Sequence, residues 1–203
     1  MRIPIRLLLA LVVLLVGCKG ELVFIGDSHT RGICTDDPCV PFTEVVAENL
    51  RGIYNVKALG FAAMPLTVMA LSDNPFTTMV APYVDGASVS VMLARGDVFY
   101  APGGIPPEWF EVLVVILENR LLAAGATRVI FNTSPPSYYD QEQWQQDLLA
   151  EYHEILTGDG RGPDNWAFLD ERHFPDCSGD CIHLNQAGHL RLGDVMSWFW
   201  MLQ

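Results

Sequence analysis

Short apolar runs that end at or beside a glycine alternate along this chain with stretches whose apolar residues recur at helical spacing. Residues 22–25 form an unbroken apolar run ending at Gly26, a pattern typical of a strand buried on both faces. Residues 54–59 end in the same way at Gly60. The same patterns predict further strands at 88–93, 128–131 and 166–169, and helices at 43–51, 64–71, 107–124, 140–156 and 185–202.

Strands that alternate with helices predict βαβ units, which build a mostly parallel sheet covered on both faces. We therefore expect an α/β fold, a three-layer α/β/α sandwich around a mostly parallel five-stranded sheet. The 203 residues suit one domain, and no linker or change of composition divides residues 21–203. In a sheet of this kind, ligands bind at the carboxyl ends of the strands.

Residues 1–17 are predicted to be an export signal rather than part of the fold. Arg2 and Arg6 precede an apolar stretch at 7–16 that is too short to span a bilayer but fits the core of a signal peptide. The alternative, a buried N-terminal helix or strand, would have to be covered on every side. The ending Leu-Val-Gly-Cys resembles a bacterial lipoprotein processing site, which implies that Cys18 is lipidated and is the first mature residue. We expect a protein anchored by this lipid on the periplasmic or cell-surface side of a membrane, or secreted.

The charge balance excludes one class of partner. The chain carries 24 acidic and 12 basic residues, a formal net charge of −12. Because binding to phosphates needs a basic surface, we expect no nucleic acid partner.

Four cysteines follow Cys18 and form an even set: Cys34, Cys39, Cys177 and Cys181. In an exported protein they are disulfide candidates, and local pairs would close two small loops. Three connectivities are possible. The alternative is a zinc site made of neighbouring residues: His173, Cys177, Cys181 and His183. Disulfides are the favoured interpretation, and we expect no metal.

Two short motifs carry possible catalytic chemistry. The first predicted strand ends in Gly-Asp-Ser-His, so the Ser28 hydroxyl is placed at a strand end, where it needs a base to become a nucleophile. Near the C-terminus, Asp180 and His183 are three residues apart, a spacing that lets the carboxylate orient the imidazole as that base. Alone, the first motif is also an ordinary turn and the second an ordinary helix cap.

Together, Gly-Asp-Ser at the first strand and Asp-x-x-His before the last helix resemble the SGNH hydrolases, the GDSL-type esterase superfamily. The resemblance covers residues 21–203 and implies an SGNH, flavodoxin-like fold and no cofactor. It implies that Ser28 is the nucleophile, His183 the general base and then acid, and Asp180 the orienting carboxylate. The implied activity is ester hydrolysis through an acyl-enzyme.

The resemblance also implies an oxyanion hole, of which one donor is replaced. The backbone N–H groups of Ser28 and Gly60 are candidate donors. The family's usual third donor is an asparagine side chain, and Gly96 stands in its place in Ala-Arg-Gly-Asp. Losing one such donor costs on the order of 100- to 1,000-fold in rate. A backbone N–H near Gly96 or the Arg95 guanidinium is a possible substitute.

His29 is expected near the substrate, as in Gly-Asp-Ser-His variants that resemble domains of polysaccharide O-acyl transfer systems.

The expected function is therefore that of a serine ester hydrolase acting on carbohydrate acetyl groups, lipids or small esters. The expected partners are an ester substrate and, through Cys18, a membrane. Three alternatives stay open: a polysaccharide or peptidoglycan O-acyltransferase, a non-catalytic surface lipoprotein, and a zinc protein.

Overall fold

The computed structural model describes residues 19–99, 103–135, 142–158, 162–174 and 182–203. The predicted signal peptide at 1–17 and Cys18 lie outside the described residues. The described chain contains a parallel four-stranded sheet with the strand order β2-β1-β3-β4. Its strands are β1 (Gly20–Gly26), β2 (Tyr54–Gly60), β3 (Ser88–Met92) and β4 (Arg128–Phe131). The predicted parallel α/β architecture is confirmed.

The central strand β1 determines where the strand ends meet. It pairs with β2 on one side and β3 on the other, so that Gly26 lies opposite both Gly60 and Met92. The three strands therefore end at the same level. The segments that leave these ends must lie side by side at one edge of the sheet.

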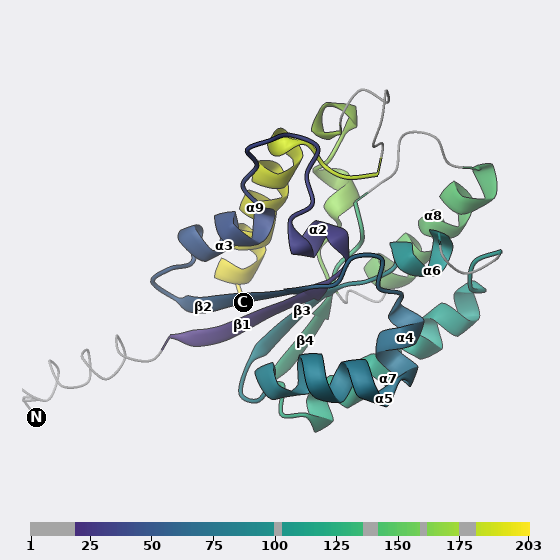
Figure 1. The fold of residues 1–203 in the computed structure, drawn as a ribbon, viewed down its shortest axis with the longest axis horizontal. Coiled ribbons are helices and arrows are strands. Elements are labelled where there is room, and N and C mark those ends of the chain that lie inside the picture. The colour runs from purple at the N-terminus through teal and green to yellow at the C-terminus, as the bar shows by residue number, and fades with distance from the viewer. Residues whose placement is uncertain (1–18, 100–102, 136–141, 159–161, 175–181) are drawn as a thin grey trace, which may run out of the picture.

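Helices cover both faces of the sheet (Figure 1). They are α3 (Phe42–Asn49) and α9 (Gln186–Met201) on one face, and α4 (Leu66–Leu71) and α7 (Pro107–Ala123) on the other, with α8 (Gln143–Gly158) packed beside α7. The side chains of β1 alternate between the two layers. Leu22 and Phe24 pack in the core under α3 and α9, whereas Val23 and Ile25 pack in the core under α4 and α7. Burial on both faces explains why this strand is continuously apolar.

Short helical turns connect these elements. They are α2 (Ser28–Arg31), α5 (Asp73–Pro75), a π-helical turn η1 (Phe76–Val80), α6 (Arg95–Phe99) and the 3-10 turns η2 (Ala81–Tyr83), η3 (Asn165–Ala167) and η4 (Glu171–His173). The predicted long helices agree with α3, α7, α8 and α9 to within a few residues. The turn α6, which follows β3, was not predicted.

The predicted fifth strand at 166–169 is wrong, because this segment begins with a capped 3-10 turn. The Asp164 carboxylate accepts hydrogen bonds from the N–H groups of Trp166 (2.9 Å) and Ala167 (3.2 Å). Asn165 reaches the chain beyond β4 through its backbone N–H to Thr133 Oγ1 (3.0 Å) and its side-chain amide to the Thr133 carbonyl (2.7 Å). Side-chain hydrogen bonds thus occupy the position where a strand ladder was expected.

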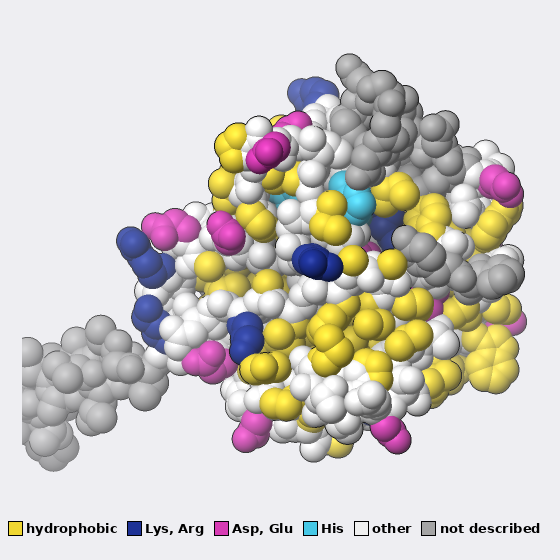
Figure 2. Space-filling view, viewed as in Figure 1, with side chains coloured by type: hydrophobic (Ala, Val, Ile, Leu, Met, Phe, Trp, Pro, Cys, Tyr) yellow, Lys and Arg dark blue, Asp and Glu magenta, His cyan; other side chains and the backbone are white. Residues whose placement is uncertain are grey.

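The molecular surface keeps some apolar area. Figure 2 shows hydrophobic side chains gathered on the lower half of one face, on the side of the sheet that α4 covers. On the outer side of α7, Trp109 is 61% exposed. Within the described part of the chain, no helix has both the length and the apolar character needed to cross a membrane.

Gly60 is expected to be irreplaceable at the end of β2. A Cβ atom there would lie 2.2 Å from the Arg31 backbone nitrogen, because α2 approaches β2 closely. We predict that Gly60→Ala lowers the free energy of unfolding by about 1–3 kcal/mol, the usual cost of overpacking. Gly52→Ala is the matched control, since nothing lies within 4 Å of its added Cβ. Urea unfolding of both variants checks this, and equal losses of stability would contradict it.

Candidate active site

Ser28 is the first residue of α2 and follows β1 directly. Asp27 caps this turn, because its carboxylate accepts a hydrogen bond from the His29 N–H at 3.0 Å. Asp27, His29 and Thr30 are buried, whereas Ser28 is partly exposed. The turn therefore holds its flanking side chains in the protein and leaves the Ser28 side chain accessible.

Ser28 lines a hollow with a volume of about 360 Å³, which includes the space at its open mouth. The described residues that line it come from the end of β1, the loop after β2, the turn α6 and the segment before α9: Asp27, Ser28, Ala63, Arg95, Gly96, Phe99, Ile182 and His183. Ser28 and His183, 155 positions apart in the numbering, thus share one hollow. A hydroxyl and an imidazole in one hollow are the groups needed for nucleophilic catalysis.

The predicted site residues fall into three groups. Ser28, His183, Arg95 and Gly96 line the hollow, as described above. Gly60 is not among the described residues that line it; its backbone instead lies against that of Arg31. Asp180 lies outside the described residues, as do Cys177 and Cys181, so the orienting carboxylate, the second disulfide and the alternative zinc site stay predictions.

His29 is fully buried and belongs to a network of polar groups beneath the hollow. Its Nδ1 lies 3.3 Å from Asp27 Oδ1, and its Nε2 lies 3.4 Å from Arg95 Nη1. Burial lowers the pKa of His29 and outweighs the opposing effect of the Asp27 carboxylate. Burial alone would raise the pKa of Asp27, but the hydrogen bonds from His29 and the nearby Arg95 guanidinium hold it below its usual value. The network therefore contains a carboxylate, a neutral imidazole and a guanidinium.

Ala63 lines the hollow and was not identified from the sequence. Its φ is +60°, in the left-handed region, within a turn closed by the hydrogen bond from the Met64 N–H to the Phe61 carbonyl at 3.2 Å. A positive φ is uncommon for alanine, and such strained positions cluster at functional sites. The residue type carries no signal for this conformation, so the sequence alone does not indicate it.

Gly96 stands where no side chain fits. A Cβ atom there would lie 2.7 Å from the Met64 carbonyl oxygen and 2.8 Å from the Pro65 nitrogen. The neighbouring Asp97 is buried and accepts hydrogen bonds from the N–H groups of Leu66 (2.6 Å) and Thr67 (3.0 Å), so it holds the start of α4 against α6. The loop before α4 therefore occupies the space that an asparagine side chain would need.

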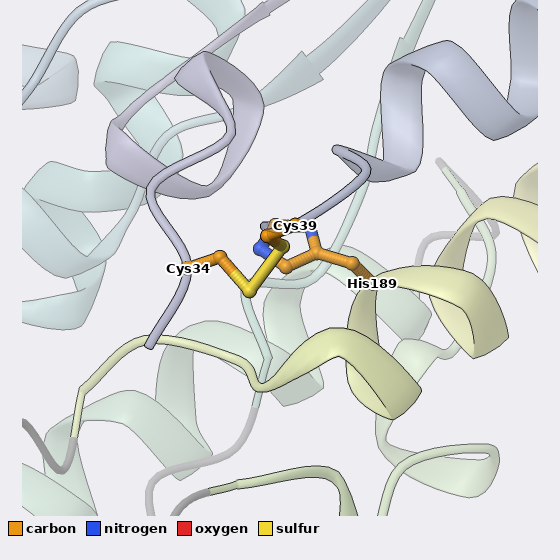
Figure 3. Close-up of side chains that lie close together, drawn as sticks. All are labelled: Cys34, Cys39 and His189. Carbon is orange, nitrogen blue, oxygen red and sulfur yellow. A yellow bond between two sulfur atoms is a disulfide. The ribbon is translucent and has the colours of Figure 1, made fainter. Parts of the chain in front are cut away.

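The disulfide region lies beside α9 (Figure 3). Cys34 and Cys39 form a disulfide, which is one of the two predicted local pairs. The ligand atoms of these cysteines and of His189 lie within 4.8 Å of one another. Both sulfur atoms are used in the disulfide, however, and zinc binds thiolates. His189 also uses both ring nitrogens, since Nδ1 accepts from the Phe42 N–H (3.2 Å) and Nε2 lies 3.1 Å from the Ile33 carbonyl. These contacts fit a structural clamp and not a metal site.

Known structures share this fold. An aryl esterase from M. smegmatis is 17% identical and superposes with a TM-score of 0.69 over 91% of this chain and 99% of its own. A carbohydrate acetylesterase from Sinorhizobium meliloti is 18% identical, with a TM-score of 0.68 and the same coverage of both chains. A putative lipolytic protein of the G-D-S-L family from Desulfitobacterium hafniense is 15% identical, with a TM-score of 0.68 over 89% of this chain and 99% of its own. No protein-family model matches the chain, and no curated protein matches it in sequence.

These similarities establish the fold. The predicted parallel α/β fold is the one that these structures share, with the four described strands in place of the predicted five. The match extends over nearly the whole length of each of the three known structures.

The packing at Gly96 predicts that an asparagine is not tolerated at this position. We expect Gly96→Asn to lower the free energy of unfolding by about 1–3 kcal/mol, because its Cβ would press on the Met64–Pro65 backbone. We also expect any ester turnover of this variant to fall and not rise. Gly158→Asn is the control, because nothing lies within 4 Å of its added Cβ. A stable Gly96→Asn protein with increased turnover would contradict this.

The clamp at His189 predicts a loss of stability in acid. Burial lowers the pKa of His189 to about 4, from an ordinary value of 6.5. As the pH falls, the unfolded chain therefore takes up the His189 proton before the folded protein does. The contribution of neutral His189 to the free energy of unfolding is complete above pH 6.5 and is lost as the pH falls from 6.5 to about 4. The loss is roughly 3 kcal/mol. Urea unfolding between pH 7 and 4 should show this extra loss in the wild type relative to His189→Gln, and equal pH dependence in the two proteins would contradict it.

Proposed function

We propose that this protein is a serine ester hydrolase that acts through an acyl-enzyme. The observation that carries the proposal is the placement of Ser28 and His183 in one hollow at the carboxyl end of the sheet. The fold shared with the aryl esterase and the carbohydrate acetylesterase supports the same class of reaction.

In this mechanism the Ser28 oxygen attacks the ester carbonyl while His183 takes its proton. The same imidazole then donates that proton to the leaving alcohol, and the acyl group stays on Ser28. A water molecule, deprotonated by His183, attacks the acyl carbonyl, the bond between the acyl carbon and Ser28 Oγ breaks, and the acid leaves as His183 returns the proton to Ser28. Asp180 is assigned the orienting role, as its spacing from His183 predicts.

Backbone groups supply the oxyanion hole in this proposal. Ser28 begins α2, and the first N–H groups of a helix have no acceptor within the helix. The Ala63 N–H is a second donor, because Ala63 lines the hollow and its positive φ turns the backbone of the loop there. We assign this role to Ala63 instead of Gly60, which does not line the described hollow.

The proposed substrates are esters of short acyl groups. Phe99 and Ile182 border the described part of the hollow beside Ser28 and limit its width. A carbohydrate acetylesterase with this fold supports an acetyl group on a sugar as one substrate of this class.

An O-acyltransferase would share the acyl-enzyme and differ in using a sugar hydroxyl in place of water, so product analysis with a glycan acceptor separates the two.

We also propose that the protein is exported and anchored through a lipid on Cys18. The apolar stretch at 7–16 and the cysteine after it support this location. The strand β1 begins at Gly20, so the folded domain would lie within two residues of the anchor.

The proposal predicts that turnover depends on Ser28. We expect Ser28→Ala to lower kcat/KM for p-nitrophenyl acetate by at least about 1,000-fold, because the nucleophile is lost. Fluorophosphonate labelling of the protein should disappear in the same variant. Ser72→Ala, at an exposed serine that ends α4, is the control and should keep wild-type activity. Equal turnover by the wild type and Ser28→Ala would overturn the proposed function.

A further inference from the structure

A buried chain of polar contacts links the nucleophile turn to the segment that carries His183. Asp27 Oδ1 lies 3.3 Å from His29 Nδ1, and His29 Nε2 lies 3.4 Å from Arg95 Nη1. The same Arg95 nitrogen donates to the Ile182 carbonyl at 3.0 Å. Asp27 and Arg95 are each 3% exposed and His29 is 0% exposed. Polar groups buried to this extent are costly unless they are paired, so their arrangement is a strong constraint on the fold.

The contacts fit a neutral His29 ring that carries its proton on Nδ1. Asp27 as a carboxylate can only accept, so His29 Nδ1 carries the proton and donates to it. With a neutral ring, Nε2 is then an acceptor and receives a hydrogen from Arg95 Nη1. The second hydrogen on that nitrogen goes to the Ile182 carbonyl, which lies 3.2 Å from His29 Nε2 and can only accept. Arg95 Nη1 therefore supplies both hydrogens of the link, since His29 Nε2 and the Ile182 oxygen are both acceptors and form no hydrogen bond with each other.

We propose that His29 and Arg95 are positioning residues that hold the Ile182 carbonyl, and thereby the His183 ring, toward Ser28. This inference rests on the proposed function of Ser28 and His183. His183 is the next residue after Ile182, so a rotation of the peptide plane between them changes the position of the His183 imidazole. The His29 and His183 rings have centroids 5.4 Å apart and planes tilted by 46°, so the network lies next to the base.

The nucleophile and its base come from distant parts of the chain, and this network is a direct link between them. Asp27 and His29 flank Ser28 on the turn after β1, while Ile182 precedes His183 just ahead of α9. Arg95 reaches both from α6. A misplacement of about 1 Å between reacting groups can cost 100-fold in rate, so a fixed link at this point has a large effect on kcat.

The experiment uses two variants of His29, of which one can keep the hydrogen bond from Arg95 and the other the hydrogen bond to Asp27. His29→Gln places an acceptor near the position of Nε2, so it can still receive the Arg95 hydrogen. His29→Asn places a donor near the position of Nδ1 but provides no acceptor for the Arg95 hydrogen. We expect kcat for p-nitrophenyl acetate to fall by 10- to 100-fold in His29→Asn, with KM changed less than threefold. We expect His29→Gln to stay within about fivefold of the wild-type kcat.

Arg95→Met removes the link at its other end and should lower kcat to the same degree as His29→Asn. His153→Gln, at a histidine outside this network, is the control and should leave kcat unchanged. If His29→Gln and His29→Asn lose equal activity, or if either His29→Asn or Arg95→Met keeps the wild-type kcat, the positioning role is overturned.

A second measurement separates this inference from the proposed function. The backbone ¹⁵N resonance of His183 reports on hydrogen bonding to the Ile182 carbonyl, whether or not the protein hydrolyses the ester. We expect this resonance to shift in Arg95→Met and His29→Asn and to return toward its wild-type position in His29→Gln. An unchanged resonance in all three variants overturns the link. Loss of Ser28-dependent turnover in the wild type, with the expected shifts present, would overturn the proposed function alone.

Discussion

The pairing of β1 with strands on both of its sides is the constraint on which the candidate site depends. Because β2 and β3 are parallel to β1 and in register with it, Gly26 lies level with Gly60 and Met92. The three segments that follow these residues must then occupy one edge of the sheet. Burial of β1 on both faces fixes this register, since a shift by one residue would exchange the side chains of the two core layers. The hollow beside Ser28 is a consequence of that register.

The sequence predicts those parts of the molecule whose signal is periodic or lies at a strand end. The strand at 128–131 was predicted with its observed bounds, and the strand-end rule predicted the position of Ser28. The pairing of Ser28 with His183 in one hollow was implied by the resemblance of the two motifs that carry them. Parts determined by tertiary contacts could not be predicted. The turn α6 is too short to show a helical period, and the segment at 166–169 is held by side-chain bonds to Thr133 that no local pattern records.

Buried polar residues are the second class that escapes prediction from sequence. Charged and polar side chains are usually exposed, so the sequence suggests that His29 contacts the substrate and that the Arg95 guanidinium is a possible oxyanion donor. Their burial becomes intelligible only through the partners that the fold supplies, namely Asp27 and the Ile182 carbonyl. A guanidinium is suited to this place because it is weakly hydrated and presents several donors in a fixed plane.

Gly96 is packed so closely against a neighbouring loop that a larger residue does not fit there. An asparagine there would bring a side-chain donor but would collide with the Met64–Pro65 backbone, which lies against α6 in this protein. The Asp97 carboxylate draws the start of α4 to that position through its hydrogen bonds to Leu66 and Thr67. The same loop places Ala63 in the hollow with a positive φ. The tight packing at Gly96 and the position of Ala63 in the hollow are therefore two aspects of one packing arrangement. In the proposed mechanism, backbone groups stand there in place of the asparagine side chain that the resemblance led us to expect.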